Sequence, residues 1–191
     1  MSTSAYKPRV AFQGERGAFS EEAALRLLGN DIQLVPRRTF ASLYDSIDND
    51  EADYVLAPVA NSIAGVVHAS VDLLQQSSLV EIDKVEIRIE QHLIGRPGAT
   101  FANIETVQSH PVALAQCRRF FAAHPRLKPI NADDTAGSVA EVMQRADTTR
   151  AAIAGSRAAE IYGAVIIRES IQDQPENFTQ FVLLAKEGKK S

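Results

Sequence analysis

Along the first half of the chain, segments with a strand-like pattern of hydrophobic residues alternate with segments that have a helix-like pattern. Short apolar runs typical of buried strands occupy residues 9–14, 32–38 and 52–61. Segments with apolar residues at helical spacing follow them at 18–29, 39–50 and 65–76. Ser20 is a suitable N-cap for the first of these helices, and Thr39 opens the second. This order predicts a mostly parallel sheet flanked by helices.

The stretch 79–96 breaks this rhythm, because it alternates for longer than one ordinary strand. We interpret it as extended chain that passes from one lobe into another. The second lobe is expected to use strands and helices in turn, at 106–110, 111–125, 127–132, 134–146, 150–155 and 156–163. The last two segments, 164–172 and 179–187, are expected to return the chain to the first lobe.

The fold class is therefore α/β, with two α/β subdomains and a cleft between them, similar to the architecture of type II periplasmic binding proteins. We expect subdomain one at about 8–84 plus 168–188, and subdomain two at about 88–166. Small ligands commonly bind in such clefts.

Composition narrows the class of function. The chain of 191 residues has a net charge of −4 and only 6% aromatic residues, so no nucleic-acid partner is expected. No apolar run approaches the roughly 18–20 residues needed to span a bilayer, so no membrane partner is expected. A single cysteine, Cys117, excludes an internal disulfide framework and fits a reducing compartment. The N-terminal segment lacks the apolar core of a signal peptide, so we expect a cytoplasmic protein. The Asn177-Phe178-Thr179 triplet is then not expected to carry a sugar.

Polar residues and glycines gather where predicted strands turn into helices, at 14–20, 58–65, 109–114, 133–138 and 156–160. Two interpretations of these residues are open. They cap the helices and form tight turns, or they form anion-binding sites at the helix N-termini. Neither a dinucleotide fingerprint nor a phosphate loop is present, and the four histidines lack zinc spacing, so no cofactor and no metal are expected. His110 before Pro111 fits a helix start, and Cys117 in mid-helix fits a small core residue. From the residues alone, two functions remain open: a protein that binds a small anion, or an enzyme that acts on one.

The motifs GERGAFSEEAA, PVANSIAGVV, SHPVALAQC, DDTAGS, AAIAGSRAAEIYG and NFTQF, in this order, resemble those of the prephenate dehydratase family. The resemblance covers nearly the whole chain and implies conversion of prephenate to phenylpyruvate in phenylalanine biosynthesis. Two of the motifs are also similar to arogenate dehydratase. The resemblance implies that Thr179 acts as general acid. The positions that it implies for substrate binding or for the lining of the cleft are Ser20, Asn61, Ser62, Ser109, Gln116, Thr135, Gln180 and Phe181. By analogy, we expect a homo-oligomer.

The sequence departs from the family pattern at two positions. The family usually has glutamate where this chain has Ala60 and arginine where it has Gln180. If the two side chains face each other, the two losses partly compensate in charge. We consider three outcomes: a tuned prephenate dehydratase, a shift to arogenate or to decarboxylation without aromatisation, or a weakly active relative. A non-catalytic binding module is the rival class.

The family commonly carries a C-terminal ACT domain, which we do not expect here because the chain stops at Ser191.

Overall fold

The computed structural model describes residues 6–188, and it divides the chain into two compact units. Unit 1 contains the chain up to Gly14, Ser20–Ile87 and the chain from Phe178 onward. Unit 2 contains Glu15–Phe19 and Arg88–Asn177. Each unit has its own sheet with helices, which agrees with the predicted α/β class.

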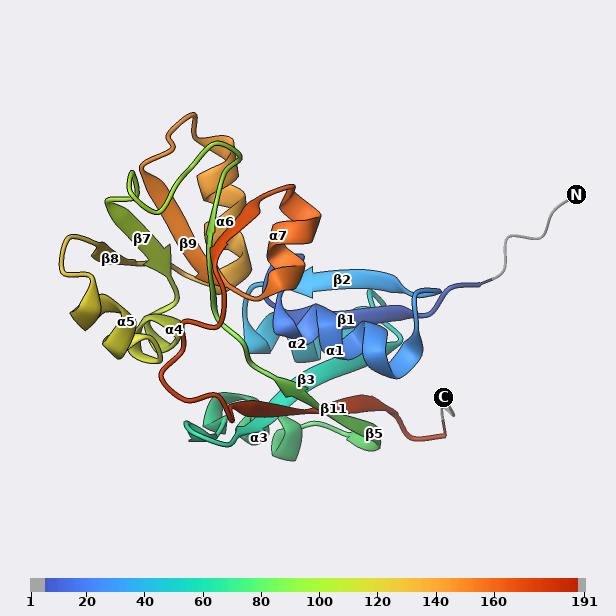
Figure 1. Cartoon of the computed structure of the whole chain (residues 1–191). Helices are drawn as coiled ribbons and strands as arrows, with labels where there is room; N and C mark the ends of the chain where they lie inside the picture. The colour runs from blue at the N-terminus through green and yellow to red at the C-terminus, as the bar shows by residue number, and fades with distance from the viewer. Residues whose placement is uncertain (1–5, 189–191) are drawn as a thin grey trace, which may run out of the picture. The chain divides into compact units, whose positions relative to one another are not determined.

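Within the described residues, the sheet of unit 1 has six strands: β1 (Arg9–Gln13), β2 (Gln33–Arg37), β3 (Tyr54–Asn61), β4 (Gly65–Val66), β5 (Leu79–Arg88) and β11 (Phe178–Lys186). The strand order is β2-β1-β3-β11-β5 (Figure 1). The short strand β4 pairs with β3. β1 is parallel to β2 and β3, whereas β3 is antiparallel to β11 and β4. The sheet is thus mixed and not mostly parallel, because β11 runs against the direction of β3.

The helices described in unit 1 are α1 (Phe19–Leu28), which enters the unit at its second residue, α2 (Phe40–Asp48) and α3 (His68–Gln76). Thr39 is the N-cap of α2, as predicted, and forms a reciprocal capping box with Ser42. The prediction for Ser20 was wrong: α1 begins one residue earlier, so Ser20 lies inside the first turn and is buried.

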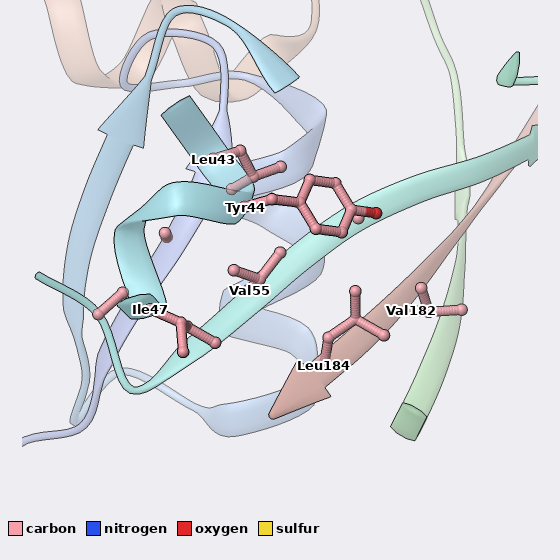
Figure 2. Packing of buried hydrophobic residues seen from close by; sticks show 9 residues of the cluster. Leu43, Tyr44, Ile47, Val55, Val182 and Leu184 are labelled. Atoms are coloured by element: carbon pink, nitrogen blue, oxygen red, sulfur yellow. The ribbon is translucent and has the colours of Figure 1, made fainter. Parts of the chain in front are cut away.

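One hydrophobic core cluster of unit 1 lies between α2 and the sheet. Ile47 lies one helical turn after Leu43 and Tyr44, so the three side chains present one face of α2 to β3 and β11 (Figure 2). Val55 from β3 and Leu184 from β11 meet that face. A fully buried aliphatic side chain of this kind contributes about 1.5–3 kcal/mol, so this contact fixes the long β3–β11 pair in place.

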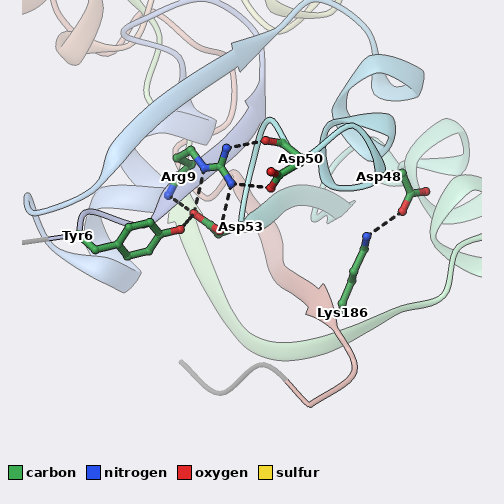
Figure 3. Close-up of polar contacts among 6 residues, drawn as sticks. All are labelled: Tyr6, Arg9, Asp48, Asp50, Asp53 and Lys186. Carbon is green, nitrogen blue, oxygen red and sulfur yellow. Dashed lines mark hydrogen bonds and ion pairs between the residues drawn. The ribbon is translucent and has the colours of Figure 1, made fainter.

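A polar network joins the start of β1 to the loop that precedes β3 (Figure 3). The carboxylate of Asp53 accepts hydrogen bonds from the Tyr6 hydroxyl at 2.5 Å and from the Arg9 backbone N–H at 2.8 Å. The Arg9 guanidinium also donates to Asp53 and to Asp50, and both carboxylates raise the pKa of Arg9. The buried charge of Asp53 is therefore paired and hydrogen-bonded.

In the part of the chain that the structure describes, the sheet of unit 2 has five strands: β6 (His92–Gly95), β7 (Thr106–Ser109), β8 (Lys128–Asn131), β9 (Arg150–Ala154) and β10 (Val165–Arg168). Their order is β10-β6-β9-β7-β8, with β7 parallel to β8 and β9, and β6 antiparallel to β9 and β10. Leu93 and Ile94 belong to different hydrophobic clusters, because successive strand residues point to opposite faces.

The segment 164–172 does not return the chain to the first lobe. It forms β10 and stays in unit 2, where Ile167 and Ile171 pack against the cluster that contains Leu93. Of the two segments expected to return, β11 is the one that re-enters unit 1. The apolar pattern of this segment carries no information about which sheet the segment joins, so the expected return to the first lobe was wrong.

The helices of unit 2 are α4 (Pro111–Ala115), α5 (Arg118–Ala123), α6 (Thr135–Gln144) and α7 (Ser156–Tyr162). The single helix predicted over 111–125 is in fact broken between α4 and α5. The Asp173 carboxylate causes the break, because it accepts the backbone N–H groups of Arg118 at 3.1 Å and Arg119 at 2.9 Å. Cys117 lies at the break and not in mid-helix, but it is buried in the core, and burial raises the pKa of its thiol to about 12.

The position of Gly17 explains why the GERGAF motif has its second glycine there. Its φ is +89°, and a Cβ atom there would lie 2.7 Å from the Cα atom of Ala158 in α7. Only glycine allows the 15–19 turn to approach this helix so closely. None of the helices within residues 6–188 combines the length and the apolar character needed to cross a membrane.

Candidate active site

Asn61 and Thr179 are directly opposite each other in the antiparallel ladder of β3 and β11. The Nδ2 atom of Asn61 donates a hydrogen bond to Oγ1 of Thr179 at 2.9 Å and to the carbonyl of Phe178 at 3.1 Å. The side chains of opposed residues lie on the same face of a sheet, so the contact follows from the register. Thr179 is half-buried at this end of β11.

The orientation of the Asn61 carboxamide is fixed by the turn that follows β3. Its Oδ1 atom accepts the backbone N–H groups of Ile63 at 3.0 Å and Ala64 at 2.8 Å. A flipped carboxamide would point its NH₂ group at these two donors, which excludes that arrangement. The NH₂ group therefore points toward Thr179.

Ser62 extends the ladder by one residue beyond β3. Its backbone N–H donates to the Phe178 carbonyl at 2.8 Å, and its Oγ accepts the Phe178 N–H at 2.9 Å. Together, Asn61 and Ser62 hold the N–H and the carbonyl of Phe178, the residue that precedes Thr179 at the entry of β11. The position of the Thr179 hydroxyl is thus determined by residues from two distant parts of the sequence.

The geometry at Thr179 favours donation of its proton. Because Oγ1 already accepts a hydrogen bond from Asn61, the hydroxyl hydrogen is directed toward another acceptor. A hydrogen bond to the oxygen also favours any negative charge that develops on it. Threonine is a weak acid by itself, and the Asn61 NH₂ group is a polarising neighbour of its hydroxyl.

Gln180 does not share a face with Thr179. Gln180 is opposite Ala60 in the ladder, and Ala60 is opposite Val66 of β4. Because successive residues in a strand point to opposite faces, the side chains of Gln180 and Thr179 diverge. The register then shifts between Gln180 and Phe181. Phe181 is buried and contributes to the core of unit 1.

The remaining predicted site residues are distributed over both units. Ser20 lies in unit 1, whereas Ser109, Gln116 and Thr135 lie in unit 2. Ser109 ends β7, is buried, and donates its hydroxyl to the Ile153 carbonyl at 2.6 Å, so its oxygen is left as an acceptor. Thr135 is the first residue of α6, after the N-cap Asp134.

Gln116 lies at the C-cap of α4 and is half-buried. Its Oε1 accepts a hydrogen bond from Nε2 of Gln91 at 3.3 Å. The sequence gives no signal for Gln91, which is one glutamine within a long extended run. His110 is the N-cap of α4, as its place before Pro111 predicts, and its Nδ1 accepts the N–H of Val112.

His92 is the most buried of the histidines. Its Nδ1 accepts the backbone N–H of Ser170 at 3.1 Å, and burial lowers its pKa, although Glu90 and Glu169 partly oppose this effect. Across residues 6–188, histidine, cysteine and carboxylate side chains do not gather in any group of three or more that could hold a metal ion.

Comparison with known proteins gives a consistent picture. Residues 10–189 match the model of the family described as prephenate dehydratase. The chain is 34% identical over 179 residues to a protein of Arabidopsis thaliana named arogenate dehydratase/prephenate dehydratase 2, chloroplastic. The match covers 94% of this chain and 46% of the plant protein. The chain spans about half the length of the curated relatives it matches.

Two solved structures have a similar fold. A prephenate dehydratase from Arthrobacter aurescens, in complex with L-Phe, superimposes with a TM-score of 0.86 at 28% identity and covers 95% of this chain and 61% of that chain. A protein called GqqA, described as a novel type of quorum quenching acylase, has a TM-score of 0.82 at 31% identity, with 95% of this chain and 65% of that chain covered.

Proposed function

Because the chain belongs to the prephenate dehydratase family, we propose that it catalyses the decarboxylating dehydration of prephenate to phenylpyruvate. The enzyme is then a hydro-lyase of phenylalanine biosynthesis. The observation that carries the proposal at the level of residues is the hydrogen bond from Asn61 to Thr179. It supports Thr179 as the group that protonates the leaving hydroxyl.

The reaction needs little from the protein beyond position and one proton. The bond between the ring and its carboxylate breaks, its electron pair enters the ring, and carbon dioxide leaves. The ring hydroxyl then departs from the opposite carbon, takes up one proton and becomes water, and the ring becomes aromatic. A positioned proton donor contributes about 10²–10⁴-fold to a step of this kind.

Asn61 supports this role in two ways. Its NH₂ group holds Oγ1 of Thr179 in place, so that the hydroxyl proton is directed toward a ligand. As the proton moves to the leaving oxygen, negative charge grows on Oγ1, and the hydrogen bond from Asn61 strengthens with that charge. The Oγ1 atom regains a proton from solvent after carbon dioxide and water have left.

Arogenate is the second candidate substrate. It differs from prephenate by an amine in place of the side-chain keto group, and the same ring chemistry then yields phenylalanine. The Arabidopsis thaliana relative is named for both activities, which supports arogenate as a second candidate. The Asn61–Thr179 pair acts on the ring hydroxyl, which both substrates carry, so it serves either reaction equally well.

Product identity tests the proposal. The purified chain is incubated separately with prephenate and with arogenate, and the products are identified by mass. We expect phenylpyruvate from prephenate, formed faster than by a Thr179→Ala control. A product that has lost carbon dioxide but kept its hydroxyl would show that the enzyme decarboxylates prephenate without aromatising it, and would contradict dehydration. Binding of prephenate with no turnover would favour the non-catalytic module.

A further inference from the structure

Gln91 is a buried polar residue in the extended chain between β5 and β6. Only 2% of it is exposed, and its backbone is bonded on both sides. Its N–H donates to Oε1 of Gln172 at 3.0 Å, and its carbonyl accepts the N–H of Ile171 at 2.8 Å. Since both backbone groups are engaged, the starting point of the side chain is rigidly set.

The Gln91 side chain has one partner and one unused atom. Its Nε2 donates to Oε1 of Gln116, whereas its own Oε1 is buried and accepts no hydrogen bond from any residue that the structure describes. A buried carboxamide oxygen without a partner is costly, because it has lost its hydrogen bonds to water. A methionine would fill similar space without that cost. The glutamine is therefore explained by what its NH₂ group does.

Gln116 is the recipient of that hydrogen bond. The carbonyl of Gln116 is held by the N–H of Asp173 at 2.6 Å, at the break between α4 and α5. Because Gln91 occupies the Oε1 atom of Gln116, the carboxamide of Gln116 turns its NH₂ group the other way. Gln116 is half-buried, so this group has access to solvent or to a ligand.

We propose that Gln91 is a positioning residue, which orients the Gln116 carboxamide so that its N–H donors meet a carboxylate of the substrate. This inference rests on the proposed function, because it takes Gln116 as a residue that contacts substrate. Carboxylates accept hydrogen bonds and donate none, so the opposite orientation of Gln116 would place oxygen against oxygen. Gln91 selects between these two orientations.

Two substitutions of Gln91 separate the roles of its shape and its hydrogen bond. Gln91→Glu keeps the shape, but its carboxylate accepts the N–H of Gln116 and so turns the oxygen of Gln116 toward the substrate. Gln91→Met keeps the approximate size and removes the preference. We expect both variants to raise KM for prephenate while kcat changes little, with Gln91→Glu the more severe at about tenfold or more.

A double-mutant cycle tests whether Gln91 affects substrate binding through Gln116. Steady-state constants are measured for the wild type, Gln91→Met, Gln116→Ala and the double variant, with circular dichroism and thermal midpoints as controls of folding. We expect Gln91→Met to have no further effect once Gln116 is alanine. The same rise in KM in both backgrounds, or a fall in kcat alone, would overturn the proposal.

Nuclear magnetic resonance tests the orientation without turnover, so it separates this inference from the proposed function. The side-chain NH₂ signals of Gln116 are assigned by their loss in Gln116→Ala. We expect Gln91→Glu to shift these signals strongly, because an N–H of Gln116 then bonds a carboxylate. Signals that stay unchanged in both Gln91 variants would contradict the proposal, even in a protein that turns over prephenate. If the wild type does not turn over prephenate but the Gln116 signals still shift in Gln91→Glu, the proposed function fails and the positioning role of Gln91 stands.

Discussion

Gln180 lies directly opposite Ala60 across the β3–β11 ladder, on the face away from Thr179. These are the two positions at which the chain departs from the family pattern of glutamate and arginine. The structure confirms that the two positions face each other, so the family pattern would place an acid opposite a base here. Both departures thus belong to one cross-strand pair, in which the loss of an acid partly offsets the loss of a base.

Restoring that pair should reveal coupling between the two positions. Ala60→Glu and Gln180→Arg are each expected to change the free energy of unfolding little. Together they should stabilise by about 0.2–1 kcal/mol more than the sum of the single effects, because opposite charges attract across strands. Urea unfolding of the four proteins measures the coupling. Strict additivity would mean that the two side chains do not meet.

The network around Asp53 should matter far more for stability than an exposed ion pair. Asp53→Asn removes a charged acceptor from Tyr6 and Arg9 in a residue that is only 8% exposed. We expect the free energy of unfolding to fall by about 1–3 kcal/mol. Asp48→Asn is the matched control, since Asp48 pairs with Lys186 with 79% of its side chain exposed (Figure 3). That control should cost less than about 1 kcal/mol, and equal losses in thermal or urea unfolding would be inconsistent with this difference.

His92 should make stability depend on pH. Burial lowers its pKa in the folded chain, so below the unfolded pKa of about 6.5 the unfolded chain binds a proton that the folded chain does not. Stability from this group is present above that pH and is lost as the pH falls through the folded pKa. Protonation at Nδ1 would also break the bond from Ser170.

The variant His92→Asn keeps an acceptor near the position of Nδ1 but does not titrate. We expect the wild type to lose more stability than this variant when the pH is lowered from 8 to 5. Thermal midpoints at both pH values measure the difference. If the wild type and the variant lose equal stability, then His92 does not titrate in this range.

The role of Asn61 can be tested with its turn left in place. Asn61→Asp keeps oxygens for the N–H groups of Ile63 and Ala64, but its carboxylate cannot donate to Thr179 and it repels charge on Oγ1. We expect kcat for prephenate to fall by about 10²-fold or more, the usual cost of one lost donor to a developing oxyanion. A normal kcat in a folded Asn61→Asp protein would remove Asn61 from the mechanism.

The sequence predicts local features well, because they depend on neighbouring residues. The periodicity of 39–50 places α2, and Thr39 marks its start. The predicted helix over 111–125 fails because Asp173, which is far along the chain, creates a new helix start at Arg118. The expected return of 164–172 to the first lobe fails because Ile167 and Ile171 pack in unit 2, which the local sequence does not reveal.

The candidate site shows the same division. The motif suggests Thr179 and the family pattern suggests Asn61, but 118 positions separate them and only the register of β3 and β11 brings them together. The same register places Gln180 on the other face, which its position next to Thr179 alone does not reveal. Gln91 has no sequence signal, because its partner and its burial are set by the fold.

The most direct measurement is the rate at which Thr179 variants form phenylpyruvate from saturating prephenate. Thr179→Val keeps the shape of the side chain without its hydroxyl, and Thr179→Ser keeps the hydroxyl. If Thr179 protonates the leaving group, the valine variant should be slower by about 10²–10⁴-fold, whereas the serine variant should keep most of the activity. A valine variant as fast as the wild type would contradict the role of Thr179.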